Sequence, residues 1–190
     1  FKSLFMKQLY FLFFLVFGLN ANAQSPSIEW QKCFGGTGHD NGNSIKKTSD
    51  GGFIIAGSTT SVNGDVTLNK GGTDVWIIKI NSIGTIEWQK TFGGSGNDRA
   101  ESIVQTSDGD YVFAGSTNSN NGDVSGNQGS ADFWVVKIDS EGILLWQKTF
   151  GSWELERAYD IQQTTDGGFI VTGSEGSFAS GGGLDDYLVV

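Results

Sequence analysis

The chain has 190 residues, including 29 glycines and a single proline, and its formal net charge at pH 7 is −9. Such an acidic chain repels phosphate backbones and anionic lipid surfaces, so we expect neither nucleic acid as a partner nor insertion into a membrane. A lone cysteine, Cys33, excludes an internal disulfide. Threonine occupies the matching position in two later copies of the surrounding motif, so we interpret Cys33 as a small strand residue.

Residues 1–23 are predicted to be a secretory signal peptide and not part of the fold. Lys2 and Lys7 precede the apolar run 9–19, and the small residues 21–23 supply a cleavage site before Gln24. The run is too short to span a membrane. The mature chain is therefore expected to be secreted or to lie at the cell surface.

A motif of the form Trp-Gln-Lys-x-Phe occurs three times. Its tryptophans, Trp30, Trp88 and Trp146, are separated by 58 residues each time. Residues 28–85 align with 86–143 without a gap and are identical at more than half of the positions. A fixed period of this kind indicates one repeated supersecondary unit that packs against its neighbours.

Each unit contains four short runs rich in β-branched and aromatic residues, which predict four strands. In the second unit the runs are 102–106, 111–115, 132–138 and 144–150. Asp-Gly joins the first two runs and Ser-x-Gly joins the last two, and both are tight-turn signals because glycine tolerates positive φ. Residues 28–34 repeat the fourth run alone, ahead of the first unit.

Four antiparallel strands at this period predict an all-β fold, a β-propeller of four-stranded blades. The expected parts are a leader with an orphan fourth strand at 24–43, blade 1 at 44–92, blade 2 at 102–150 and a truncated blade 3 at 159–190. Runs such as 53–56 are apolar throughout, as strands sandwiched between blades require. Three units are fewer than a closed ring needs, so we expect an open, incomplete arc. A solenoid of stacked β-units is the alternative.

Residues 137–146, Lys-Ile-Asp-Ser-Glu-Gly-Ile-Leu-Leu-Trp, resemble the tryptophan-docking signature of quinoprotein-dehydrogenase-like propellers. Residues 79–88 are similar, with Asn81 in place of the aspartate. The whole unit resembles the delta-sixty type propeller repeats of secreted bacterial proteins, which share Trp-Gln-Lys-Thr-Phe-Gly-Gly-Ser-Gly-Asn-Asp and Asp-Phe-Trp-Val-Val-Lys. The resemblance covers 28–190 and implies that Trp30, Trp88 and Trp146 dock against the next blade. It implies no known activity.

The long loops and the segments between units are predicted to emerge on one face, which is the expected binding surface. Acidic residues recur there with the period, and two interpretations apply to them. They are either oxygen ligands for Ca²⁺ or turn formers that bond to backbone amides. No complete calcium loop is present, which favours turns. The calcium candidates are Asp65, Asp74, Asp123 and Asp132.

No catalytic or cofactor-binding residue is predicted. His39 is the single histidine and is expected to be exposed to solvent. Trp153 lies outside the 58-residue spacing. Its side chain is expected either to stack on a sugar or to cover part of the long-loop face. We expect a non-catalytic binding or interaction scaffold with a protein or glycan ligand on the long-loop face. The alternative is an exported glycan hydrolase or quinone-dependent dehydrogenase whose catalytic residues lie outside this chain.

Overall fold

The computed structural model describes residues 25–176 and 185–189, so the predicted signal peptide lies outside the described residues. The described chain contains strands and no helix, and its strands form three antiparallel sheets. The expected all-β class is confirmed. Within these ranges no helix is long and apolar enough to cross a membrane.

Each sheet is a meander in which consecutive strands are neighbours. Sheet 1 comprises β1 (Asp40–Lys47), β2 (Phe53–Thr59), β3 (Asp74–Ile80) and β4 (Ile86–Phe92). Sheet 2 comprises β5 (Asp98–Gln105), β6 (Tyr111–Thr117), β7 (Asp132–Ile138) and β8 (Leu144–Phe150). Sheet 3 comprises β9 (Leu155–Gln163), β10 (Phe169–Gly176) and β11 (Asp185–Val189).

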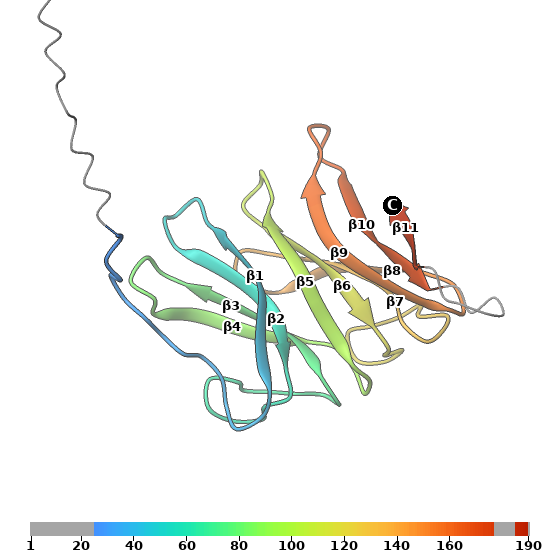
Figure 1. Ribbon diagram of the computed structural model, residues 1–190, viewed down its shortest axis with the longest axis horizontal. Coiled ribbons are helices and arrows are strands. Elements are labelled where there is room, and N and C mark those ends of the chain that lie inside the picture. The colour runs from blue at the N-terminus through green and yellow to red at the C-terminus, as the bar shows by residue number, and fades with distance from the viewer. Residues whose placement is uncertain (1–24, 177–184, 190) are drawn as a thin grey trace, which may run out of the picture.

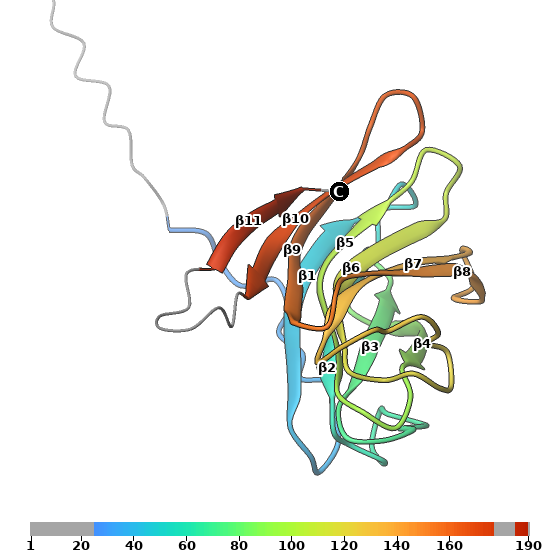
Figure 2. The same cartoon turned by 90° about the vertical axis from the view of Figure 1, so that its right-hand side faces the viewer.

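The sheets follow one another along the long axis of the molecule (Figure 1). The first strand of sheet 2, β5, contacts β1, β2 and β3 of sheet 1, and β9 contacts β5, β6 and β7 in the same way. In the view of Figure 2, β1, β5 and β9 again lie next to one another. Sheets 1 and 3 lie at opposite ends, so the described residues form an open series of sheets.

The first strand of each sheet begins earlier than the apolar pattern indicates. The strand predicted from Ser102 begins at Asp98, and its polar first residues pair with the end of β6. A β-bulge between Ala100 and Ser102 shifts the register at this point. The apolar pattern does not predict these first strand residues, because they join the sheet through backbone hydrogen bonds and not through burial of apolar side chains.

The tight turns have their glycines at positive φ, as predicted. In the Asp-Gly turns, φ is 88° at Gly51, 94° at Gly109 and 87° at Gly167. In the Ser-x-Gly turns, φ is 75° at Gly84 and 78° at Gly142. Side chains other than glycine are strained in this region of φ, so the turn chemistry fixes where each hairpin closes.

Two apolar interfaces hold the sheets together. Between sheets 1 and 2, Trp134 is fully buried and meets Phe113 edge-on, with 5.7 Å between the ring centroids. The interface between sheets 2 and 3 contains Val112, Ala114, Phe133, Val135, Ala158, Ile161 and Val171. Strand β6 therefore contributes to both interfaces, as the apolar character of the second runs predicts.

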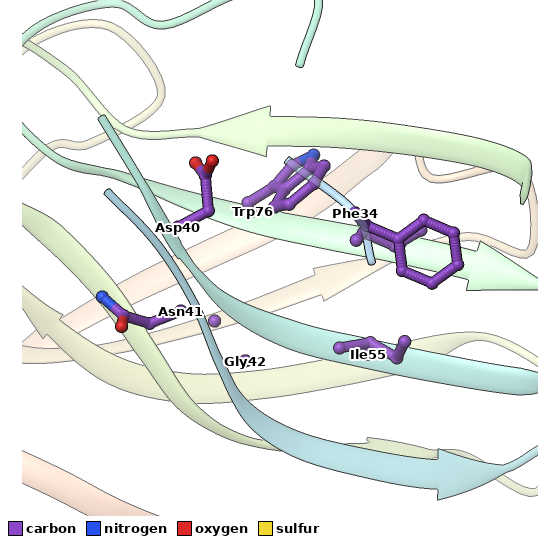
Figure 3. Close-up of a pocket in the computed structure, with 8 residues that line it drawn as sticks. Phe34, Asp40, Asn41, Gly42, Ile55 and Trp76 are labelled. Carbon is purple, nitrogen blue, oxygen red and sulfur yellow. The ribbon is translucent and has the colours of Figure 1, made fainter. Parts of the chain in front are cut away.

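The outer face of sheet 1 carries a third apolar cluster. Trp76 and Ile78 are buried in this cluster, and Phe34 from the preceding segment packs against it. A pocket of about 110 Å³ lies among Phe34, Ile55 and Trp76 (Figure 3). One repeat later, the equivalent residues are Phe92 at the end of β4, and Phe113 and Trp134 of sheet 2. There the space is filled by side chains of sheet 1, so the pocket is the uncovered half of an interface that the fold uses elsewhere.

Residues 28–34 do not form the strand that the sequence predicts. No strand in the described ranges supplies them with a hydrogen-bonded partner. Trp30 nevertheless reaches sheet 1, where its Nε1 donates to the carbonyl oxygen of Ser82 at 3.2 Å. Trp88 makes the same contact with Ser140 of sheet 2 at 3.0 Å. The segment thus lies against sheet 1 as β4 lies against sheet 2, without a sheet of its own.

Candidate functional site

The loops after β2 and β6 lie on the same face of the molecule as the segments that lead into the following sheets. Backbone hydrogen bonds join them: Asp98 N donates to Thr73 O at 2.6 Å, and Glu156 N donates to Ala131 O at 2.7 Å. We call this surface the loop face. It consists of residues 35–39, 60–73, 93–97, 118–131 and 151–154.

The first and second units share a polar framework beneath the loop face. In the second unit, the buried carboxylate of Asp98 accepts hydrogen bonds from Gly94 N at 2.9 Å, from Ser119 Oγ at 2.7 Å and from Thr117 Oγ1. The equivalent donors to Asp40 in the first unit are Gly36 N, Ser61 Oγ and Thr59 Oγ1. These are the contacts of aspartates that organise turns. The framework holds the loops in a fixed arrangement.

Two pairs of buried carboxyl groups lie within this framework, one at each interface. A methyl group added to Gly93 would lie 2.7 Å from Asp74 Oδ1 and 2.6 Å from Asp98 Oδ2, so the two oxygens converge on this glycine. At Gly151 the converging oxygens belong to Asp132 and Glu156. Within the described residues, the converging oxygens of Asp74, Asp132 and Glu156 have no hydrogen-bond partner.

Burial raises the pKa of Asp74 to about 6, and the nearby carboxylates of Asp98 and Asp123 raise it as well. Burial also raises the pKa of Asp132, with a contribution from Glu156. Like charges at short distance in a dry site disfavour ionisation of both groups. Asp74 and Asp132 therefore keep their protons to a higher pH than an exposed aspartate does.

Replacing Asp74 with asparagine is expected to stabilise the protein at pH 8 by about 1–2 kcal/mol and to change little at pH 4. The pKa of Asp74 is about 6 in the folded protein and near 4 in the unfolded chain. The protonated carboxyl therefore contributes its full stability below about pH 4, and this contribution is lost as the pH rises through about 6. Asparagine keeps an acceptor for Lys70 N and can place an amide donor toward Asp98. Urea denaturation at the two pH values measures the difference.

The matched control for this prediction is Asp139→Asn. Asp139 accepts turn bonds from Glu141 N and Ile143 N, and Asn81 makes the same bonds in the first unit. Its substitution should have the same small effect at both pH values. A gain for Asp74→Asn that is larger at pH 4 than at pH 8 would contradict the prediction.

The structure places the calcium candidates Asp65, Asp74 and Asp123 in different surroundings. Asp74 lies near Asp98 and Asp123, whereas Asp65 accepts a hydrogen bond from Gly35 N at 3.0 Å on the preceding segment. Asp123 also forms an ion pair with Lys70. Among the residues described, no group of three or more His, Cys, Asp or Glu side chains is arranged to hold a metal ion.

Two equivalent grooves open on the loop face between the first strands of successive sheets, each with a volume of about 380 Å³. The groove between sheets 1 and 2 is lined by His39, Asp40, Asn41, Ser58, Thr60, Thr73 and Arg99. The groove between sheets 2 and 3, which we call the arginine groove, is lined by Asn97, Arg99, Glu101, Ser116, Asn118, Ala131, Leu155, Arg157 and Tyr159.

The grooves differ between units, whereas the framework beneath them is repeated. At the position that follows the framework acid, the units carry Asn41, Arg99 and Arg157. At the position of Glu101, the third unit carries Tyr159. Sequence reasoning concentrated on the residues that recur and missed these arginines and the tyrosine. The signal that identifies them is a contrast along the strand: the side chain changes from Asn41 to Arg99 and Arg157, whereas the position before it is acidic in every unit.

Comparison with known proteins finds no family model that matches the chain, and a search of curated proteins finds no match.

The tryptophans of the Trp-Gln-Lys motif are less buried than the term docking suggests. Trp88 and Trp146 are half-buried and Trp30 is 37% exposed. Trp88 meets Tyr111 of sheet 2 edge-on, and Trp146 meets Phe169 of sheet 3 in the same way. Trp88 and Trp146 therefore bridge consecutive sheets from positions that are only partly buried, at the rim of each interface.

The remaining candidates lie at the surface. His39 is exposed, as predicted, and lines the groove between sheets 1 and 2. Trp153 is 73% exposed, which agrees with its position outside the motif spacing. Cys33 is exposed and lies outside the strands of the described chain, so its interpretation as a strand residue is wrong.

Proposed function

We propose that the three sheets are blades of a β-propeller and that the protein is a secreted binding scaffold without catalysis of its own. The repeated interface supports the architecture: β5 and β9 contact the preceding sheet in the same way. The open pocket on the outer face of sheet 1 also supports it, because another blade would fill this pocket as sheet 1 fills the equivalent space in sheet 2 (Figure 3).

The observation that carries the proposed function is the pair of equivalent grooves with different linings. A rigid framework that repeats while its exposed side chains vary is an arrangement suited to recognition, because a preorganised site loses little entropy on binding. The proposed partner is a protein or a glycan that contacts the loop face. The acidic composition of the chain disfavours nucleic acid.

The experiment that tests this proposal follows export, binding and turnover together. The full-length protein is located by cell fractionation, then incubated with immobilised polysaccharides and extracellular proteins. Retention on a ligand without release of product supports the scaffold. Release of reducing ends, or reduction of a dye that depends on a quinone cofactor, would instead establish the alternative of an exported propeller enzyme.

The outer faces of the terminal sheets lead to a prediction about association. Residues 24–190 in isolation are expected to form dimers or larger species, despite the negative charge, because the apolar face around Ile55 and the exposed Ile170 lack the neighbouring sheet that covers their equivalents. Unpaired strand edges favour association further. Static light scattering measures the mass, and a stable monomer would show that these faces need no neighbour.

A further inference from the structure

Arg99 and Arg157 are the two arginines of the sequence, and they stand 58 residues apart. They begin equivalent strands, β5 and β9, and line the arginine groove from its two sides. Both side chains are exposed. In a chain with a net charge of −9, the repeat thus places its guanidinium groups in one recess of about 380 Å³.

Neither guanidinium forms an ion pair with a carboxylate in the described part of the chain, whereas Lys70, Lys79 and Lys137 are paired. Glu101 is the acidic residue that lines the groove. Burial raises the pKa of Glu101, while Arg99 and Arg157 lower it. With Glu101 ionised, the three charged side chains of the lining still sum to one positive charge. The groove therefore favours an anion, and the planar forks of two guanidiniums suit a carboxylate.

The rest of the lining suits a sugar. The side chain of Tyr159 is half-exposed, and its hydroxyl is held by Ser174 Oγ at 2.9 Å, which fixes the ring. A fixed aromatic ring offers an apolar face at little entropic cost. Asn97, Asn118 and Ser116 add amide and hydroxyl groups of the kind that hydrogen-bond to sugar hydroxyls.

We propose that the arginine groove binds a uronic acid residue of an acidic polysaccharide, with the carboxylate held by Arg99 and Arg157 and the pyranose ring against Tyr159. This inference rests on the proposed function as an extracellular binding scaffold and names its ligand class. The groove between sheets 1 and 2 has Asn41 in place of the second arginine, so it is expected to bind the same sugar more weakly.

The test is isothermal titration of the protein with tri-galacturonate, with neutral galactotriose and inorganic sulfate as separate arms. Tri-galacturonate should bind, and Arg157→Gln should weaken binding by about tenfold to a hundredfold, because a hydrogen bond to a charged group is lost. Arg157→Lys keeps the charge but lacks the planar fork, so its affinity for tri-galacturonate should lie between those of the parent protein and Arg157→Gln. The matched control is Lys148→Gln, which removes one exposed positive charge outside the groove and should change binding less than about twofold.

Several results would overturn the inference. These are no binding of tri-galacturonate, equal binding of galactotriose, equal binding of sulfate, or equal losses in Arg157→Gln and Lys148→Gln. Circular dichroism of each variant verifies that the fold is intact. Reducing ends are measured in the same samples, since their release would contradict the non-catalytic scaffold while leaving the ligand class standing. The two proposals can therefore fail separately.

Discussion

Replacing Trp134 with alanine is expected to lower the free energy of unfolding by about 3–5 kcal/mol, as for other fully buried large aromatics. The side chain has no exposed surface and lies between sheets 1 and 2. Its ring packs edge-on against Phe113, and its Nε1 donates to Gln147 Oε1 at 2.9 Å. The substitution would leave a cavity and would also remove the hydrogen-bond donor to Gln147 Oε1.

The loss of stability on replacing a tryptophan should decrease as the exposure of its side chain increases. Trp88 is half-buried at the rim of the same interface, so Trp88→Ala should cost less than Trp134→Ala. Trp153→Ala, at a position that is 73% exposed, should stay within about 0.5 kcal/mol of the parent protein. Urea denaturation followed by circular dichroism gives the order. If Trp88→Ala costs as much as Trp134→Ala, the rim contacts contribute more than burial indicates.

The sequence predicted the hairpins well because the turns carry their own signals. The third and fourth strands of the second unit, β7 and β8, have the predicted bounds, and the Asp-Gly and Ser-x-Gly turns have glycine at positive φ. These features depend on residues close in the chain. Local chemistry is enough to specify them.

Features that depend on packing between sheets were predicted less well. The spacing of Trp88 and Trp146 marks a repeated contact, but it does not distinguish a rim position from the centre that Trp134 occupies. Asp98 looks like a loop residue because its side chain is polar, although it is fully buried and begins β5. Residues 28–34 have the sequence of a strand, but a strand requires a partner.

The candidate site was missed for a related reason. Repetition draws attention to what is constant, and in this chain the constant residues form the framework. Arg99 and Arg157 come together only because β5 and β9 lie next to each other in space, which no local pattern states. Asp74 illustrates the same point, since its Oδ1 converges with Asp98 of the next unit while its Oδ2 accepts a hydrogen bond from Lys70 N of its own loop.

Replacing Gly115 with alanine is expected to destabilise the protein by about 3 kcal/mol, at the upper end for an overpacked site. Gly115 lies in β6 opposite Ala100, beside the bulge of β5. An added methyl group would lie 1.8 Å from Arg99 O and 2.8 Å from Ala100 Cα. These are backbone atoms, so no rotamer change can relieve the contact, and the strands must separate. Equivalent close approaches occur at Gly57 and Gly173.

The control is Gly42→Ala in β1. Its added methyl group would lie 3.7 Å from the nearest atom, Ile55 Cγ2, and the equivalent positions of the other units are Ala100 and Ala158. It should be neutral or stabilising by up to about 1 kcal/mol, since alanine restricts the unfolded chain. Thermal and urea denaturation of both variants measure the contrast.

Gly115→Ala also displaces the backbone of Arg99. The fraction of this variant that remains folded should therefore bind tri-galacturonate more weakly than the parent protein does, whereas Gly42→Ala should leave binding unchanged. Equal stability of the two variants would show that the bulge can relax, and that the arginine groove rests on a looser backbone than the close contacts indicate.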